Sequence, residues 1–126
     1  QHSIQLIDPA SEQVLHTLVV PKAWYGLAFT EDEKFLYVSG GHDNRINKYA
    51  IQNNKLMLVD SLLLGNKWPE KIGPAGIEIN ESTQQLFVVT REDKQLYIFD
   101  LNTKKIIGKY SFWVGIHNTY GNVERI

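Results

Sequence analysis

An all-β fold built from repeated four-stranded antiparallel units is predicted by three features of the sequence. First, residues 35–39 (Phe-Leu-Tyr-Val-Ser) return as residues 86–90 (Leu-Phe-Val-Val-Thr). Second, short apolar runs alternate with polar segments rich in turn-forming residues along most of the chain. Third, no window shows a sustained helical period, so helix is expected to be minor or absent.

Ten strands are expected, each an apolar run bounded by turn residues. They cover, in order, residues 3–8, 14–20, 25–29, 35–39, 46–51, 56–64, 76–79, 86–90, 95–101 and 106–112. Asp8-Pro9 ends the first strand and Pro21 ends the second, because proline favours turns and cannot continue a central strand. Polar residues at 30–34 separate the third strand from the fourth. After the fourth strand, a second turn is expected at residues 40–44 (Gly-Gly-His-Asp-Asn), because these residues tolerate positive φ.

The later strands follow the same order. Residues 52–55 form a hairpin turn after the fifth strand, and residues 102–105 form the corresponding turn before the tenth. The sixth strand leads into a longer, proline-bearing loop at 65–75. Polar residues at 80–85 and 91–94 separate the next strands. The turn chemistry therefore supports one strand order in both copies.

The repeat length and the strand composition narrow the architecture. Ile4, Ile46 and Leu96 hold equivalent places, which gives a period of about 40–50 residues with four strands per cycle, typical of the blades of a β-propeller. In residues 36–38 and 96–99 both alternating faces are apolar, as in sheets that are covered on both sides. A two-sheet β-sandwich is the alternative. We therefore predict a partial β-propeller of about two and a half four-stranded antiparallel blades.

The blades are expected to span residues 1–112. The segment 113–126 is an atypical C-terminal tail, because it has no inner-strand run and no paired turn. Two and a half blades do not close a ring, so the first and last blades should expose apolar surface and unpaired strand edges. The chain is therefore expected to associate with copies of itself or to be completed by missing blades, and to aggregate when it is alone and monomeric.

A family resemblance is carried by two inner strands with acidic residues downstream and by two outer hairpins: 36–39 with Asp43-Asn44, 86–90 with Asp93, and the hairpins 97–107 and 5–15. These segments resemble the YVTN-type β-propeller repeat. Proteins of that family are mostly periplasmic or secreted, have seven blades, and in some bacteria are fused ahead of a phosphoesterase domain. The resemblance implies a periplasmic or extracellular location and is unspecific for activity.

Composition excludes several classes of partner and site. The net charge is -1, from 13 basic and 14 acidic residues, which argues against a nucleic-acid partner held by counterion release. No run reaches the roughly 18 apolar residues that a membrane helix needs, so no membrane insertion is expected. The chain has no cysteine for disulfides or thiolate zinc sites. His2, His16 and His117 are scattered, so neither a metal nor a cofactor is expected.

The candidate binding surface consists of four loops that a propeller would place around its central channel. They are residues 21–25, 40–44, 66–71 and 91–94. Binding residues concentrate on loops that a rigid scaffold holds. The candidate ligand-binding residues are Trp24, Tyr25, His42, Asp43, Trp68, Glu70, Lys71 and Arg91. Alternatively, the two tryptophans fill the seams between blades and the charges are solvated.

The sequence His42-Asp43-Asn44 admits two interpretations. An imidazole beside a carboxylate can act as a base or a metal ligand. However, the corresponding loop at 91–93 has no histidine, and Gly-Gly-His-Asp-Asn favours a turn in which Asp43 or Asn44 bonds nearby backbone amides. The turn is preferred. At equivalent strand ends, Asp8 and Asp100 are expected to cap the turns that follow them.

These observations predict a non-catalytic β-propeller segment that serves as a binding or protein-interaction platform for a protein or a small molecule. No Gly-Xaa-Ser-Xaa-Gly elbow, phosphate loop or His-Glu-Xaa-Xaa-His motif is present. The alternative is a lactonase-like hydrolase that acts on a cyclic ester, since residues 44–56 are similar to outer hairpins of lactonase propellers. In that case His42, Glu70 and Arg91 are the only candidates for the chemistry.

Overall fold

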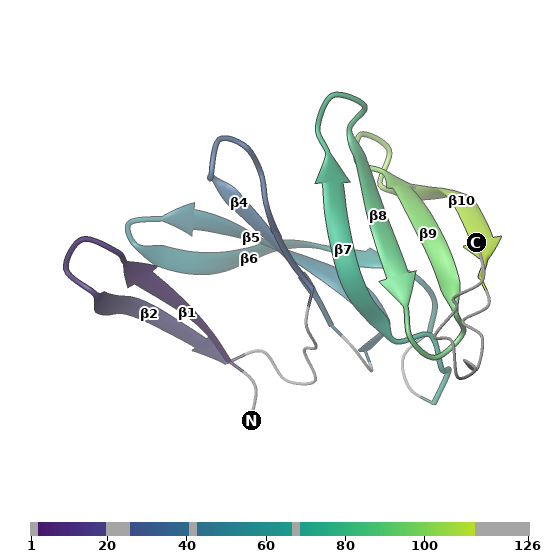
Figure 1. Ribbon diagram of the computed structural model, residues 1–126, viewed down its shortest axis with the longest axis horizontal. Coiled ribbons are helices and arrows are strands. Elements are labelled where there is room, and N and C mark those ends of the chain that lie inside the picture. The colour runs from purple at the N-terminus through teal and green to yellow at the C-terminus, as the bar shows by residue number, and fades with distance from the viewer. Residues whose placement is uncertain (1–2, 20–25, 41–42, 67–68, 113–126) are drawn as a thin grey trace, which may run out of the picture.

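The computed structural model describes residues 3–19, 26–40, 43–66 and 69–112 (Figure 1). Within these ranges the chain forms ten strands in three antiparallel sheets and no α-helix. The strands are β1 (Ser3–Asp8) and β2 (Gln13–Val19) in the first sheet, β3 (Leu27–Phe29), β4 (Phe35–Ser39), β5 (Arg45–Gln52) and β6 (Lys55–Leu63) in the second, and β7 (Pro74–Asn80), β8 (Gln85–Thr90), β9 (Gln95–Asp100) and β10 (Lys105–Ser111) in the third. The predicted all-β fold of about two and a half four-stranded blades is confirmed.

Within each sheet the strand order follows the chain, so strands that pair are consecutive in the sequence. The bounds of β7 differ from the prediction, because it begins at Pro74 rather than at residue 76. Pro74 pairs with Thr90 of β8. Because β7 is the edge strand of the third sheet, the N–H that proline lacks is tolerated there without loss of a hydrogen bond between strands. The predicted tail at 113–126 lies outside the described residues.

Strand β4 of the middle sheet is covered on both faces. Leu36 and Val38 of β4 belong to a buried cluster against which Ile4 of the first sheet packs. Tyr37, which lies between them and points the opposite way, belongs to a second cluster together with Tyr97 of the third sheet. Tyr37 is 4% exposed and Tyr97 is 2% exposed. The three sheets therefore stack in series, as Figure 1 shows, and a two-sheet sandwich does not describe them.

The predicted turn caps are confirmed at both aspartates. Asp8 Oδ1 accepts a hydrogen bond from the Ala10 N–H at 3.0 Å, and Asp8 Oδ2 accepts one from the Ser11 hydroxyl at 2.9 Å. Asp100 Oδ1 accepts one from the Asn102 N–H at 3.0 Å. The bonds from Ser11 and Ala10 lower the pKa of Asp8. These side chains satisfy backbone donors that the tight turns leave without strand partners.

The pair formed by the second and third sheets has two flanks that are open in whole or in part. Leu27 and Phe29, on the flank that the hairpin β1–β2 covers only in part, are 52% and 54% exposed, and Val89 and Tyr110, on the other flank, are 41% and 54% exposed. In the part of the chain that the structure describes, no helix is long and apolar enough to cross a membrane.

Candidate functional site

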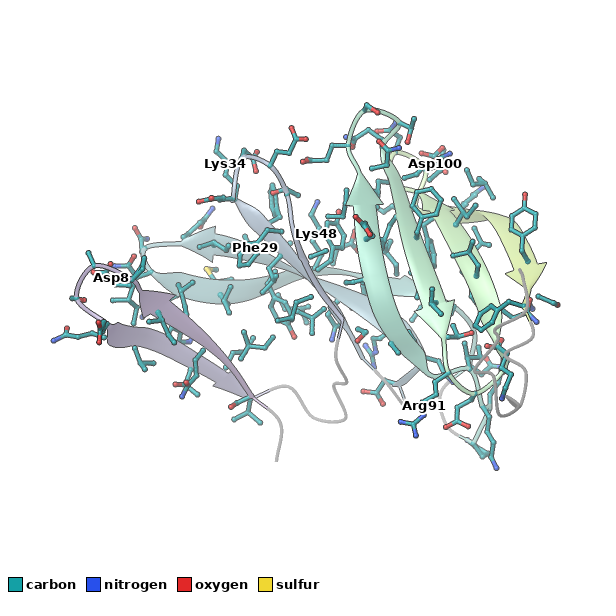
Figure 2. The ribbon with its side chains drawn as sticks, viewed as in Figure 1. Asp8, Phe29, Lys34, Lys48, Arg91 and Asp100 are labelled. Atoms are coloured by element: carbon teal, nitrogen blue, oxygen red, sulfur yellow. The ribbon has the colours of Figure 1, made fainter. Side chains whose placement is uncertain are left out.

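Three connections meet at one end of the second and third sheets. The turns at 40–44 and 91–94 follow the strands β4 and β8, and the segment 64–73 joins β6 to β7. The Arg91 N–H donates to the carbonyl oxygen of Gly73 at 2.8 Å, which fixes this segment to the β8–β9 turn. Figure 2 shows Arg91 at this end, with its side chain extending away from the turn.

Asn44 holds the same segment on its other side. Its Nδ2 group donates to the carbonyl oxygens of Asn66 and Glu70, both at 2.7 Å, and its Oδ1 accepts from the Gly73 N–H at 2.9 Å. The side chain is 1% exposed, and the backbone φ of 54° is one that asparagine tolerates well. One carboxamide therefore satisfies three backbone groups, one each on Asn66, Glu70 and Gly73, and holds these residues in place.

A second polar cluster lies below the β8–β9 turn. The Thr90 hydroxyl and the Tyr97 hydroxyl both donate to the carboxylate of Asp93, the latter at 2.5 Å. The Gln95 N–H donates to the Thr90 hydroxyl oxygen at 2.9 Å. Burial raises the pKa of Tyr97 most, and the hydrogen bond and charge of Asp93 and the charge of Glu70 raise it further. The cluster therefore favours the neutral phenol.

This cluster predicts a loss of stability at alkaline pH. Because the pKa of Tyr97 is raised in the folded chain, its contribution is complete below about pH 10, the ordinary tyrosine value, and falls as the pH rises further. Tyr97→Phe should cost about 1 kcal/mol at pH 8, since it removes one buried hydrogen bond. The difference between wild type and variant should shrink at pH 11, as measured by urea unfolding followed by circular dichroism. Parallel pH profiles of the two proteins would contradict this assignment.

The structure places four of the eight predicted ligand-binding residues. Asp43, Glu70, Lys71 and Arg91 all lie on the three connections at this end of the sheets. The other four predicted residues lie outside the described residues: Trp24, Tyr25, His42 and Trp68. The His42-Asp43-Asn44 turn is therefore tested only in part. Its Asp43 N–H donates to the Gly40 carbonyl at 3.1 Å, as in a tight turn.

The carboxylates at this end have defined neighbours. Asp43 Oδ2 lies 4.0 Å from Arg45 Nη2. Glu70 Oε2 accepts a hydrogen bond from the Asn66 N–H at 3.3 Å, so the side chain of Glu70 folds back over its own loop. A methyl group at Gly65 would lie 2.6 Å from Glu70 Oε1, so only glycine leaves room for this arrangement.

The exposed groups at this end are suited to ion pairs and hydrogen bonds. Glu70, Lys71 and Arg91 are exposed, and the backbones of Glu70 and Arg91 are held by the bonds described above. Among the residues that the structure places, no three His, Cys, Asp or Glu side chains come together in a way that could hold a metal ion. The described surface therefore presents charges on a fixed support, an arrangement suited to recognition of a polar group.

Sequence reasoning missed the residues that build this support. Asn44 was expected to bond only nearby amides, but its partners lie more than twenty residues away in the chain. Thr90, Asp93 and Tyr97 were not among the candidates. A signal was present, since Asp93 follows a strand end at a spacing that lets its carboxylate turn back toward the hydroxyls of both neighbouring strands.

Comparison with known families gives one match that covers most of the chain. The family described as lactonase, 7-bladed beta-propeller, matches residues 23–110. It is related to the YVTN-type propellers that the sequence resembles. No curated protein is similar enough to count as a relative.

The solved structures named here support the fold alone, because each is below 25% identity. Hydrazine synthase of Kuenenia stuttgartiensis is 19% identical with a TM-score of 0.70, covering 87% of this chain and 30% of that chain. A functionally unknown protein of Desulfotomaculum acetoxidans is 12% identical with a TM-score of 0.71, covering 88% and 34%. The periplasmic gluconolactonase of Pseudomonas aeruginosa is 21% identical with a TM-score of 0.54, covering 68% and 25%. The chain thus spans about a third or less of these structures.

Proposed function

Because the chain belongs to the lactonase family of seven-bladed β-propellers, we propose that it is a non-catalytic part of such a ring and serves as a binding platform. The observation that carries the proposal is that the polar side chains at this end of the second and third sheets have two different roles. Buried Asn44 and half-buried Asp93 hold the loops by hydrogen bonds, and exposed charges lie on these loops. Such a surface can bind a ligand without a catalytic acid–base pair.

The ligand that best fits the described surface is polar and carries a carboxylate. Lys71 and Arg91 would pair with the carboxylate, and Glu70 would accept hydrogen bonds from hydroxyl groups. Both a small polyhydroxy acid and an acidic side chain of a protein partner present this chemistry. Nucleic acid and membrane insertion remain unfavoured by the net charge of -1 and the short apolar runs.

Gluconate is a suitable probe for this surface. We expect it to bind weakly, as followed by NMR titration, and we expect Arg91→Ala and Lys71→Ala each to weaken binding about two- to five-fold, the effect of one exposed ion pair. Lys34→Ala is the matched control, because Lys34 lies on the turn at the opposite end of the second sheet (Figure 2). Equal losses in all three variants, or no gluconate binding, would contradict the proposed site.

The family match favours a second candidate, a lactonase-like hydrolase that opens a cyclic ester. Glu70 and Arg91 are its described candidates, and His42 is its third. The same titration distinguishes the two functions if glucono-δ-lactone is added and acid release is followed at constant pH. The platform predicts no acceleration over buffer. Acceleration that is lost in both Glu70→Gln and His42→Ala would favour the hydrolase.

The open flanks belong to the same proposal. We expect further blades of a longer polypeptide to complete the ring, with self-association as the alternative, because Phe29 and Tyr110 would otherwise leave apolar surface in water. A periplasmic or extracellular location is also proposed. It is supported by the YVTN-type resemblance and by the periplasmic gluconolactonase of similar fold.

A further inference from the structure

The outermost strands of the three sheets share one irregularity. Each contains a β-bulge, a residue without a partner on the neighbouring strand: Leu15 in β2, Val59 in β6 and Ile107 in β10. The residues that directly follow the bulges therefore hold equivalent places, and they are His16, Asp60 and Gly108. The residues three places before the bulges of β6 and β10 are equivalent as well, and they are Leu56 and Lys104.

These equivalent places make a contact at both junctions between sheets. At the first junction, where β2 lies beside β6 (Figure 1), the Leu56 N–H donates to Nδ1 of His16 at 2.9 Å. At the second, Lys104 Nζ lies 2.7 Å from Asp60 Oδ2. In each contact, the residue after a bulge accepts a hydrogen bond from the next sheet along the chain. We call these contacts the His16 latch and the Asp60 latch.

The two latches respond differently to acid. Nδ1 of His16 can accept a hydrogen bond only while the ring is neutral and carries its proton on Nε2. A further proton would bind at Nδ1 and would set two N–H donors against each other. Histidine is the side chain that ordinarily changes charge between pH 5 and 8. Asp60 keeps its charge over that range, because the hydrogen bond from Lys104 lowers the pKa of its carboxyl group.

The amide that His16 accepts from depends on this bond. Strand β6 is an edge strand of the second sheet, so the N–H groups along its outer side have no strand partner among the described residues. Leu56 is only 4% exposed, so water reaches its amide poorly. Loss of the imidazole acceptor would therefore leave a buried donor unsatisfied, which favours opening of the contact.

No other charge takes over the role of His16. The charged side chains on the surrounding elements are Lys55 on β6, Arg45 and Lys48 on β5, Glu31, Glu33 and Lys34 on the turn between β3 and β4, and Asp8 and Glu12 on the turn between β1 and β2. Within the described part of the chain, none of them forms an ion pair with His16. The apolar contact beside the latch consists of Ile4 and Leu18, which pack against the second sheet and do not titrate.

We propose that the His16 latch is a pH-sensitive device that sets how tightly the hairpin β1–β2 is held on the second sheet. At neutral pH the ring accepts from Leu56 and the contact is closed. In mild acid the charged ring faces the Leu56 N–H, and the hairpin detaches more often. The junction between the second and third sheets stays closed, because the Asp60 latch is unchanged. This device does not depend on any ligand at the loop end.

Amide exchange of the full chain, followed by NMR and corrected for the intrinsic rate at each pH, tests the proposal. From pH 7.5 to pH 5.5 we expect the protection of Leu56 to fall about five- to tenfold. Residues 4–6 and 16–18 should lose protection by a similar factor, because a two-stranded hairpin is marginally stable by itself and exchanges when it detaches. Residues 96–99 of the third sheet should change less than twofold.

Two variants assign the effect to the ring. His16→Asn keeps a side-chain oxygen near the place of Nδ1 but does not titrate, so its Leu56 protection should be independent of pH and within about threefold of the wild type at pH 7.5. Asp60→Ala is the matched control at the other junction, and it should leave the pH dependence of Leu56 intact. A pH effect that persists in His16→Asn would overturn the proposal.

The unmodified protein decides the question even if a variant does not fold. The amide resonance of Leu56 should shift with pH at the same midpoint as the ring protons of His16. Different midpoints, or protection of Leu56 that stays constant between pH 7.5 and pH 5.5, would show that the ring does not control this contact.

Discussion

Gly26→Ala is expected to destabilise the protein by about 2 kcal/mol or more, although it adds a single methyl group. A Cβ atom at this position would overlap the carbonyl oxygen of Ala75 and lie 3.0 Å from Ser39 Oγ. Gly26 is also held in place, since its N–H donates to Ser39 Oγ at 3.1 Å. The second and third sheets approach each other here backbone to backbone, so neither neighbour can move aside cheaply. Urea unfolding followed by circular dichroism measures the effect.

Gly76→Ala is the matched control. Gly76 corresponds to Gly26 in the repeat, but no heavy atom lies within 4 Å of a Cβ atom built there. The change in unfolding free energy should therefore stay within about 0.5 kcal/mol. Similar losses at the two glycines would show that the effect is a local backbone one and not the contact between sheets. In a completed ring, where a further blade covers this flank, Gly76→Ala should become as harmful as Gly26→Ala.

Asn44→Asp is expected to cost about 3 kcal/mol or more at neutral pH. The carboxamide donates to two carbonyl oxygens, and a carboxylate in its place would face both with no proton to give. The side chain is 1% exposed, so water does not relieve the conflict. Lowering the pH should recover part of the loss in this variant, since a protonated carboxyl can donate once. Chemical unfolding at pH 4.5 and pH 7 tests both statements.

The backbone conformation must be separated from the hydrogen bonds at Asn44. Asn44→Gly removes the carboxamide but keeps the φ of 54° accessible, so it should still cost most of the stability. Lys94 has the same φ of 54° at the corresponding place of the next turn, so Lys94→Gly reports the effect of placing glycine in this conformation alone. If Lys94→Gly and Asn44→Gly change the stability equally, the three bonds of Asn44 are not the cause.

The loop segment and the proposed ligand surface are coupled through this residue. Asn44 bonds the backbone of Glu70, which stands beside Lys71. Gluconate affinity in Asn44→Gly should therefore fall even though no group that pairs with the carboxylate has been changed. The platform depends on rigid loops as much as on their charges.

Most of the fold could be predicted because it depends on short-range patterns. Alternating apolar runs and turn residues define the ten strands, and Asp8 and Asp100 cap their turns through bonds to residues two or three places along. The placement of Glu70, Lys71 and Arg91 at one end of the sheets could also be predicted, since propeller topology assigns their loops to that end. The hydrogen bonds that hold these loops could not be predicted, because the partners of Asn44 and Asp93 depend on which segments lie opposite.

The sequence by itself determined which residues form strands, how the strands are ordered and where the turns bend, because each of these depends on residues close together in the chain. Tertiary structure alone decided which apolar side chains are buried and which polar side chains have hydrogen-bond partners. Ile77 and Leu27 share one pattern, yet the first is packed and the second is 52% exposed. The burial and hydrogen bonding of a side chain depend on the segment that packs against it. The sequence of the side chain's own strand does not specify that segment.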